Sequence, residues 1–119
     1  MDTQAITIDE YNNDGSFINL YYYNESVCEW CAYDFSAYGL WLLCKSSGYN
    51  TLQSFSKEMQ MPCLIIVKNA LIRLLQNVTD IVELTDSRVK IRMSEKITLD
   101  AYRGWVKTLK GKIPEIYKL

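Results

Sequence analysis

Four cysteines are the residues best suited to chemistry in this sequence, and two of them, Cys28 and Cys31, are separated by only two residues. Such a pair between a strand and a helix is typical of dithiol redox sites. The chain from Cys31 to Pro62, however, predicts two helices and no strand for the sheet of a redox fold. Because there is no histidine, a zinc site would also need Cys44 and Cys63, whereas structural zinc sites usually contain two close pairs. We therefore expect neither a metal site nor a cofactor.

The residue types also argue against an enzyme. A chain without histidine excludes histidine acid–base catalysis and the Ser-His and Cys-His nucleophilic schemes. Its five glycines do not cluster, so no phosphate-binding loop is expected. The sequence predicts no catalytic residues and no small-molecule substrate.

Charge is divided unequally along the chain. Residues 1–44 contain seven acidic and no basic residues, whereas residues 45–119 contain thirteen basic and seven acidic ones. This division can indicate a nucleic-acid-binding half, or it can let the two halves attract each other within the fold.

The sequence has no apolar run long enough for a membrane span and no signal-peptide pattern at its start, so we expect a cytoplasmic protein that does not enter a membrane.

Apolar periodicity predicts the elements that would position these residues. Alternation predicts strands at residues 5–10 and 17–23, joined by a turn at 12–16, which together form an N-terminal β-hairpin within residues 1–30. Pro62 suits the first turn of a helix, because its missing N–H would be unpaired there. The other elements are expected at residues 34–45 (helix), 51–59 (short helix), 62–77 (helix), 81–84 and 89–93 (hairpin), and 94–119 (a C-terminal helix capped by Thr98). We therefore expect one α+β domain over residues 1–119.

The order of elements within residues 34–93 resembles the winged helix-turn-helix family. Residues 51–59 look like the second helix of that family, and residues 80–93 look like its wing. Residues 62–76 resemble its recognition helix, because they carry the common spacing of Val67, Ala70, Leu71, Arg73 and Leu74. The resemblance implies a winged-helix core of three helices and a β-hairpin wing, extended by the N-terminal hairpin and the C-terminal helix.

The resemblance further implies that the third helix enters the major groove of DNA while the wing contacts the backbone. The DNA-binding residues would then be Lys68, Asn69, Arg73 and Gln76 on the helix and Arg88, Lys90 and Arg92 on the wing. The expected function is a small DNA-binding regulator, acting alone or as a dimer. This hypothesis requires that the residues after Pro62 form a helix and not a strand.

Three isoleucines on the same predicted helix favour an alternative function. Ile65, Ile66 and Ile72 are apolar where a groove-reading helix usually presents polar side chains, and an exposed apolar face more often binds a partner protein or a second copy of the chain. The alternative is therefore a protein-interaction or inhibitor module, of the kind that a phage or mobile element could encode. It would use this apolar face or the acidic N-terminal surface.

Overall fold

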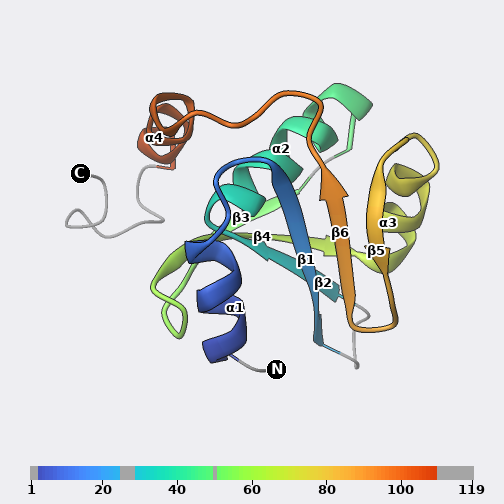
Figure 1. Cartoon of the computed structure of the whole chain (residues 1–119), viewed down its shortest axis with the longest axis horizontal. Coiled ribbons are helices and arrows are strands. Elements are labelled where there is room, and N and C mark those ends of the chain that lie inside the picture. The colour runs from blue at the N-terminus through green and yellow to red at the C-terminus, as the bar shows by residue number, and fades with distance from the viewer. Residues whose placement is uncertain (1–2, 25–28, 50, 110–119) are drawn as a thin grey trace.

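The computed structural model describes residues 3–24, 29–49 and 51–109 and has an α+β fold (Figure 1). Six antiparallel strands form one sheet in the order β3-β4-β2-β1-β6-β5. In chain order the elements are α1 (Thr3–Tyr11), β1 (Phe17–Asn24), β2 (Glu29–Tyr33), α2 (Phe35–Ser47), β3 (Leu52–Ser56), β4 (Met61–Val67), α3 (Lys68–Leu75), β5 (Ile81–Leu84), β6 (Arg88–Arg92) and α4 (Leu99–Lys107). None of the helices within these described residues is long and apolar enough to cross a membrane.

The sheet separates two apolar cores. The larger one, the α2-side core, joins α2, α3 and α4 to the sheet; its members include Ile18, Leu20, Leu40, Cys44, Leu64, Ile66, Leu71, Leu74, Val89, Ile91 and Trp105. The smaller α1-side core contains Ile6, Tyr21, Cys31, Tyr33, Met59 and Cys63. Because successive side chains of a strand point to opposite faces, Leu20 and Tyr21 of β1 enter different cores. The sheet is therefore covered on both faces, and α1 is the helix of the smaller core.

The first predicted strand is wrong, because residues 5–10 lie within helix α1. Ile6 and Glu10, four residues apart, are the buried residues of this helix, whereas Ile8 is 52% exposed. The alternation of Ile6 and Ile8 therefore did not reflect a buried strand face. The predicted N-terminal hairpin within residues 1–30 is wrong for the same reason, since β1 pairs with β2 and β6 instead.

The predicted helices at residues 51–59 and 62–77 are also wrong. Residues 52–56 form β3, residues 61–67 form β4, and only residues 68–75 are helical. β4 lies between β2 and β3, and it buries Leu64 in one core and Cys63 in the other. A strand buried on both faces has a continuous apolar run without alternation, and such a run cannot be distinguished from a buried helix by periodicity. The winged-helix core is accordingly not confirmed.

Elements with strong local signals lie where the sequence predicts them. The strand at residues 17–23, the helix at 34–45 and the hairpin at 81–93 are confirmed, with small shifts of their ends. Of the C-terminal helix expected within 94–119, the part from Leu99 to Lys107 is confirmed, and residues 110–119 lie outside the described residues. Gly48 ends α2 in the left-handed conformation, at φ 77°, which glycine adopts without a steric penalty.

The cap of α4 provides a test of its contribution to stability. The Thr98 hydroxyl accepts a hydrogen bond from the Ala101 N–H at 3.2 Å. Thr98→Ala is therefore expected to lower the free energy of unfolding by about 1 kcal/mol, measured by urea denaturation. Thr7→Ala, inside α1, is the matched control and should leave stability unchanged or slightly higher, because alanine is the better helix former. Equal effects of the two substitutions would contradict the capping role.

Candidate functional site

The residues predicted to bind DNA do not lie on one surface. Four of them were predicted on the recognition helix and lie on or next to the short helix α3: Lys68, Asn69, Arg73 and Gln76. This helix is on the α2 side of the sheet, because its residues Leu71 and Leu74 belong to the α2-side core. On β6, Val89 and Ile91 also belong to the α2-side core, so that the alternate residues Arg88, Lys90 and Arg92 face the α1 side. The sheet therefore separates the two predicted halves of the site.

The cations of β6 interact mainly within the molecule. Arg88 forms ion pairs with Asp9 at 2.9 Å and with Glu83 at 3.5 Å, and Arg92 pairs with Asp80 at 3.1 Å. The Lys90 ammonium lies 4.3 Å from the centre of the Phe17 ring. The unequal charge of the two halves thus contributes to contacts between α1 and the sheet, although each partly exposed pair is worth little stability by itself.

The three predicted isoleucines are also dispersed. Ile66 is 3% exposed within the α2-side core, and its neighbour Ile65 points to the other face of β4. Ile72 of α3 is 45% exposed. Of the predicted protein-interaction residues, Ile72 is therefore the one with a largely accessible side chain.

Ile72 lies in an apolar groove between α3 and the hairpin of β5 and β6. This α3–hairpin groove has a volume of about 310 Å³, and its lining residues are Tyr22, Trp30, Lys68, Leu71, Ile72, Leu75, Leu84, Thr85, Asp86 and Val89. The rings of Tyr22 and Trp30 are 5.4 Å apart between their centres. The groove thus combines an aromatic pair with aliphatic side chains from a helix and a hairpin.

The strand that supplies Leu84 is at the edge of the sheet. β5 pairs with β6 on one side, and it ends the sheet on the other. Three of its four residues, Ile81, Val82 and Leu84, are exposed, and Leu84 is 62% exposed. Figure 1 shows this strand and α3 together at the end of the sheet opposite to α4.

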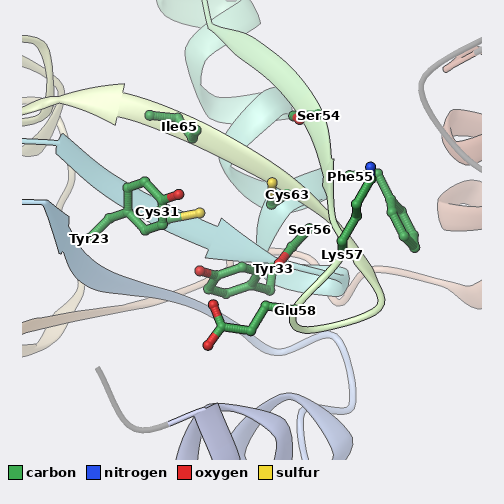
Figure 2. Close-up of a pocket in the computed structure, with 10 residues that line it drawn as sticks. All are labelled: Tyr23, Cys31, Tyr33, Ser54, Phe55, Ser56, Lys57, Glu58, Cys63 and Ile65. Carbon is green, nitrogen blue, oxygen red and sulfur yellow. The ribbon is translucent and has the colours of Figure 1, made fainter.

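A second cavity lies on the α1 side of the sheet and contains two thiols. This thiol pocket, of about 240 Å³, is lined by Tyr23, Cys31, Tyr33, Ser54, Phe55, Ser56, Lys57, Glu58, Cys63 and Ile65. Figure 2 shows that Cys31 comes from β2 and Cys63 from the neighbouring β4, and that Lys57 and Glu58 come from the loop that joins β3 to β4. Thiols, hydroxyl groups and both signs of charge therefore meet in a small space.

The two thiols influence each other. A side-chain hydrogen bond from Cys31 lowers the pKa of Cys63, although burial opposes the shift, and a further hydrogen bond from Ser54 also lowers it. The same contact with Cys63 raises the pKa of Cys31 far above its usual value, and burial adds to the rise. Cys63 is therefore the thiol that ionises first.

The four-cysteine zinc site considered from the sequence is not formed, because Cys44 is separated from Cys31 and Cys63. Cys44 belongs to the α2-side core, on the other face of the sheet from Cys31 and Cys63, and burial raises its pKa to about 11. Cys28 lies outside the described residues. Among those described, no group of three or more histidine, cysteine, aspartate or glutamate side chains is placed to hold a metal ion.

A buried carboxylate that the sequence analysis overlooked connects α1 to the sheet and to α2. Glu10 accepts hydrogen bonds from the hydroxyls of Ser36 at 2.7 Å and Tyr21 at 2.9 Å, and from the amide groups of Asn19 at 3.0 Å and Asn13 at 3.4 Å. Its pKa is raised because burial disfavours the charged form, although all four hydrogen bonds oppose the rise. The carboxylate is buried and accepts hydrogen bonds from β1, from α2 and from the residues after α1, so we assign Glu10 a structural role.

Comparison of the chain with protein-family models, with curated proteins and with solved structures finds no match. The case for a function therefore depends on the geometry of the α3–hairpin groove and of the thiol pocket.

Proposed function

We propose that this protein is a non-enzymatic binding module that holds an extended segment of a partner protein along β5 and in the α3–hairpin groove. The observation that carries the proposal is the position of an exposed apolar edge strand directly beside an apolar groove, with Leu84 contributing to both.

An exposed edge strand is a risk that proteins usually limit. Free N–H and C=O groups along an edge can pair with another chain, and proteins commonly protect such edges with charged residues, proline or a covering helix. β5 has an irregularity between Ile81 and Glu83 and one acidic residue, but otherwise presents apolar side chains. Adding a strand to such an edge is a common way to bind a peptide, with main-chain hydrogen bonds for affinity and side-chain pockets for specificity.

The groove favours a particular kind of segment. Ile72 on one wall and Leu84 on the other leave apolar surface that a large aliphatic or aromatic side chain of the partner would remove from water. Lys68 on the α3 wall of the groove would attract an acidic residue beside that apolar one, whereas Asp86 on the hairpin wall disfavours an acidic residue there. The expected ligand is thus an extended sequence with an apolar anchor next to an acidic side chain.

DNA binding by a small regulator stays a prediction, but the positions of its candidate residues in the fold do not favour it. Its recognition helix is replaced by a strand and a helix of eight residues, and its candidate contacts are divided between the two faces of the sheet. The inhibitor alternative that uses the acidic N-terminal surface also loses support, because two of its acidic residues form ion pairs within the chain. Asp9 pairs with Arg88, and Asp14 pairs with Lys96. An inhibitor that binds its target through the α3–hairpin groove remains within the proposed function.

The proposal can be tested with a peptide library. Peptides of about twelve residues displayed on phage would be selected against the full chain, and their affinities measured by fluorescence anisotropy. Leu84→Lys is expected to weaken binding at least tenfold, about 1.4 kcal/mol, because it places an ammonium group in the apolar groove. Leu99→Lys is the matched control, since Leu99 of α4 is also exposed but does not line the groove. The Leu99→Lys variant should bind the selected peptides with the affinity of the wild type.

Three results would contradict the proposal. One is that the selected peptides bind the Leu84→Lys variant as tightly as the wild type. Another is a wild-type dimer that Leu84→Lys dissociates in size-exclusion chromatography, because a second copy would then occupy the edge. The third is that the protein binds a fluorescent DNA duplex with an affinity that Leu84→Lys leaves unchanged. In that case Lys90→Ala would flatten the slope of log K against log salt by about 0.9, the value for one phosphate contact.

A further inference from the structure

We propose that the thiol pocket binds one soft, thiophilic cation of the Cu(I) class between the sulfur atoms of Cys31 and Cys63. This site is independent of the α3–hairpin groove, because it lies on the other face of the sheet and shares no residue with it.

The strand register brings the two sulfur atoms together. Cys31 of β2 is opposite Ile65 of β4, and Cys63 is opposite Tyr33, so the two cysteines are diagonal neighbours whose side chains share one face of the sheet. Both side chains line the thiol pocket, and each thiol is close enough to the other to shift its pKa. Two thiolates that share one cation, each about 2.3 Å from it, lie up to about 4.6 Å apart, whereas a disulfide requires about 2.05 Å. The cation would therefore take the place of the two thiol protons.

The available ligands select the class of ion. Thiolates are soft ligands that favour Cu(I), whereas carboxylate and carbonyl oxygens suit magnesium, calcium and manganese. Structural zinc almost always has four ligands, and the described residues contain no group of three or more histidine, cysteine or acidic ligands. A monovalent ion that accepts two sulfur ligands satisfies these conditions. Met59 and Met61 pack in or against the same core and add soft thioether character to the surroundings.

Neighbouring groups can stabilise the bound state. Tyr33 makes a side-chain hydrogen bond with Cys31, and Ser54 makes one with Cys63; hydroxyl groups that donate to ligand atoms orient them and tune the site. A Cu(I) ion with two thiolates has a net charge of −1. Lys57 and Glu58 are the charged residues of the pocket lining and have opposite signs, so the lining itself adds no net charge.

Binding changes protonation but not oxidation state. Two S–H bonds break and two Cu–S bonds form, while two protons leave to solvent and the copper remains Cu(I). Because both protons are released, affinity should rise with pH, by up to about 100-fold per unit below the pKa values of both thiols.

The test is an anaerobic titration of the reduced full-length protein with Cu(I) in competition with a chromogenic Cu(I) chelator. We expect one Cu(I) per chain. Cys31→Ser and Cys63→Ser should each weaken binding by at least about 100-fold, since loss of a second-shell partner alone costs about 10- to 100-fold. Cys44→Ser and Cys28→Ser are the matched controls and should retain the wild-type affinity. Circular dichroism would establish that each variant is folded.

A second measurement uses the wild type alone and does not depend on how the variants fold. Mass spectrometry would map alkylation by iodoacetamide with and without one equivalent of Cu(I), and we expect protection of Cys31 and Cys63 but not of Cys44. The proposal is wrong if Cu(I) protects neither cysteine of the pocket, if the folded Cys63→Ser variant keeps the wild-type affinity, or if Cys28→Ser abolishes binding as Cys31→Ser does. The last result would assign the ion to the pair with two intervening residues.

Discussion

Glu10→Ala is expected to lower the free energy of unfolding by about 3 kcal/mol or more, because it leaves several buried donors without their acceptor. Asn19, Tyr21 and Ser36 all donate to this carboxylate, and they belong to β1 and α2. The substitution therefore weakens the attachment of α1 and disturbs the junction of strand and helix beneath it. Urea denaturation followed by circular dichroism would measure the loss.

Glu95→Ala is the matched control for this prediction, since Glu95 is exposed to solvent. Its effect should stay within about 0.5 kcal/mol, as for most surface substitutions. A Glu10→Ala variant as stable as Glu95→Ala would show that water replaces the carboxylate without cost, and would contradict the structural role assigned to Glu10.

The same carboxylate should make stability depend on pH. Its folded-state pKa is raised above the ordinary value of 4.5, mainly by burial. The folded protein therefore holds this proton more tightly than the unfolded chain, and the contribution of Glu10 to stability falls as pH rises from about 4.5 through the folded-state pKa. The Glu10→Gln variant lacks this titration. The stability of the wild type relative to Glu10→Gln should thus decrease over that interval, and a constant difference between pH 4 and 8 would contradict the raised pKa.

Local chemistry explains why about half of the elements could be predicted. The turn between β5 and β6 is closed by hydrogen bonds between Thr85 and Arg88, α4 begins at the cap Thr98, and α2 ends at the left-handed Gly48. Each of these signals acts within a few residues. The sequence pattern therefore contains the information that places these elements, without knowledge of their neighbours.

The remaining elements depend on contacts that a single sequence does not display. β4 is a strand because β2 and β3 pair with it on both sides and both of its faces are buried, and its apolar run from Cys63 to Val67 equally suits a buried helix. A helix over residues 62–77 would present Ile65 and Ile66 on one face, whereas in β4 they point to opposite sides of the sheet. The error in one element thus produced the error in the predicted site.

Both candidate sites arise from the same long-range pairing. Cys31 and Cys63 are 32 positions apart in the sequence and meet because β2 pairs with β4. The sequence links Cys31 to Cys63 only through the four-cysteine zinc site considered above, and no local pattern pairs the strands that carry them. The α3–hairpin groove likewise joins β1, β2, α3 and the β5–β6 hairpin, so that its lining could not be assembled from periodicity alone.

Gly15→Ala is expected to destabilise the protein by about 3 kcal/mol. Gly15 lies in the turn between α1 and β1 at φ 97°, a conformation that residues with a Cβ rarely adopt and that costs about 1–3 kcal/mol. A Cβ atom there would fall well inside van der Waals contact of the Ile97 carbonyl oxygen and 3.1 Å from its carbon. That backbone is held in place, because the Gly15 carbonyl accepts a hydrogen bond from the Ile97 N–H at 2.8 Å.

The matched control for Gly15→Ala is Gly104→Ala within α4, where an added Cβ meets nothing within 4 Å. This second substitution should stabilise the protein by about 0.5–1 kcal/mol, because alanine is the better residue in a helix interior. Thermal and urea unfolding of both variants would compare them, and opposite signs are expected. If Gly15→Ala were neutral, the segment that leads into α4 would have to move away from the turn at no cost, and the close approach of Gly15 to Ile97 would not contribute to the fold.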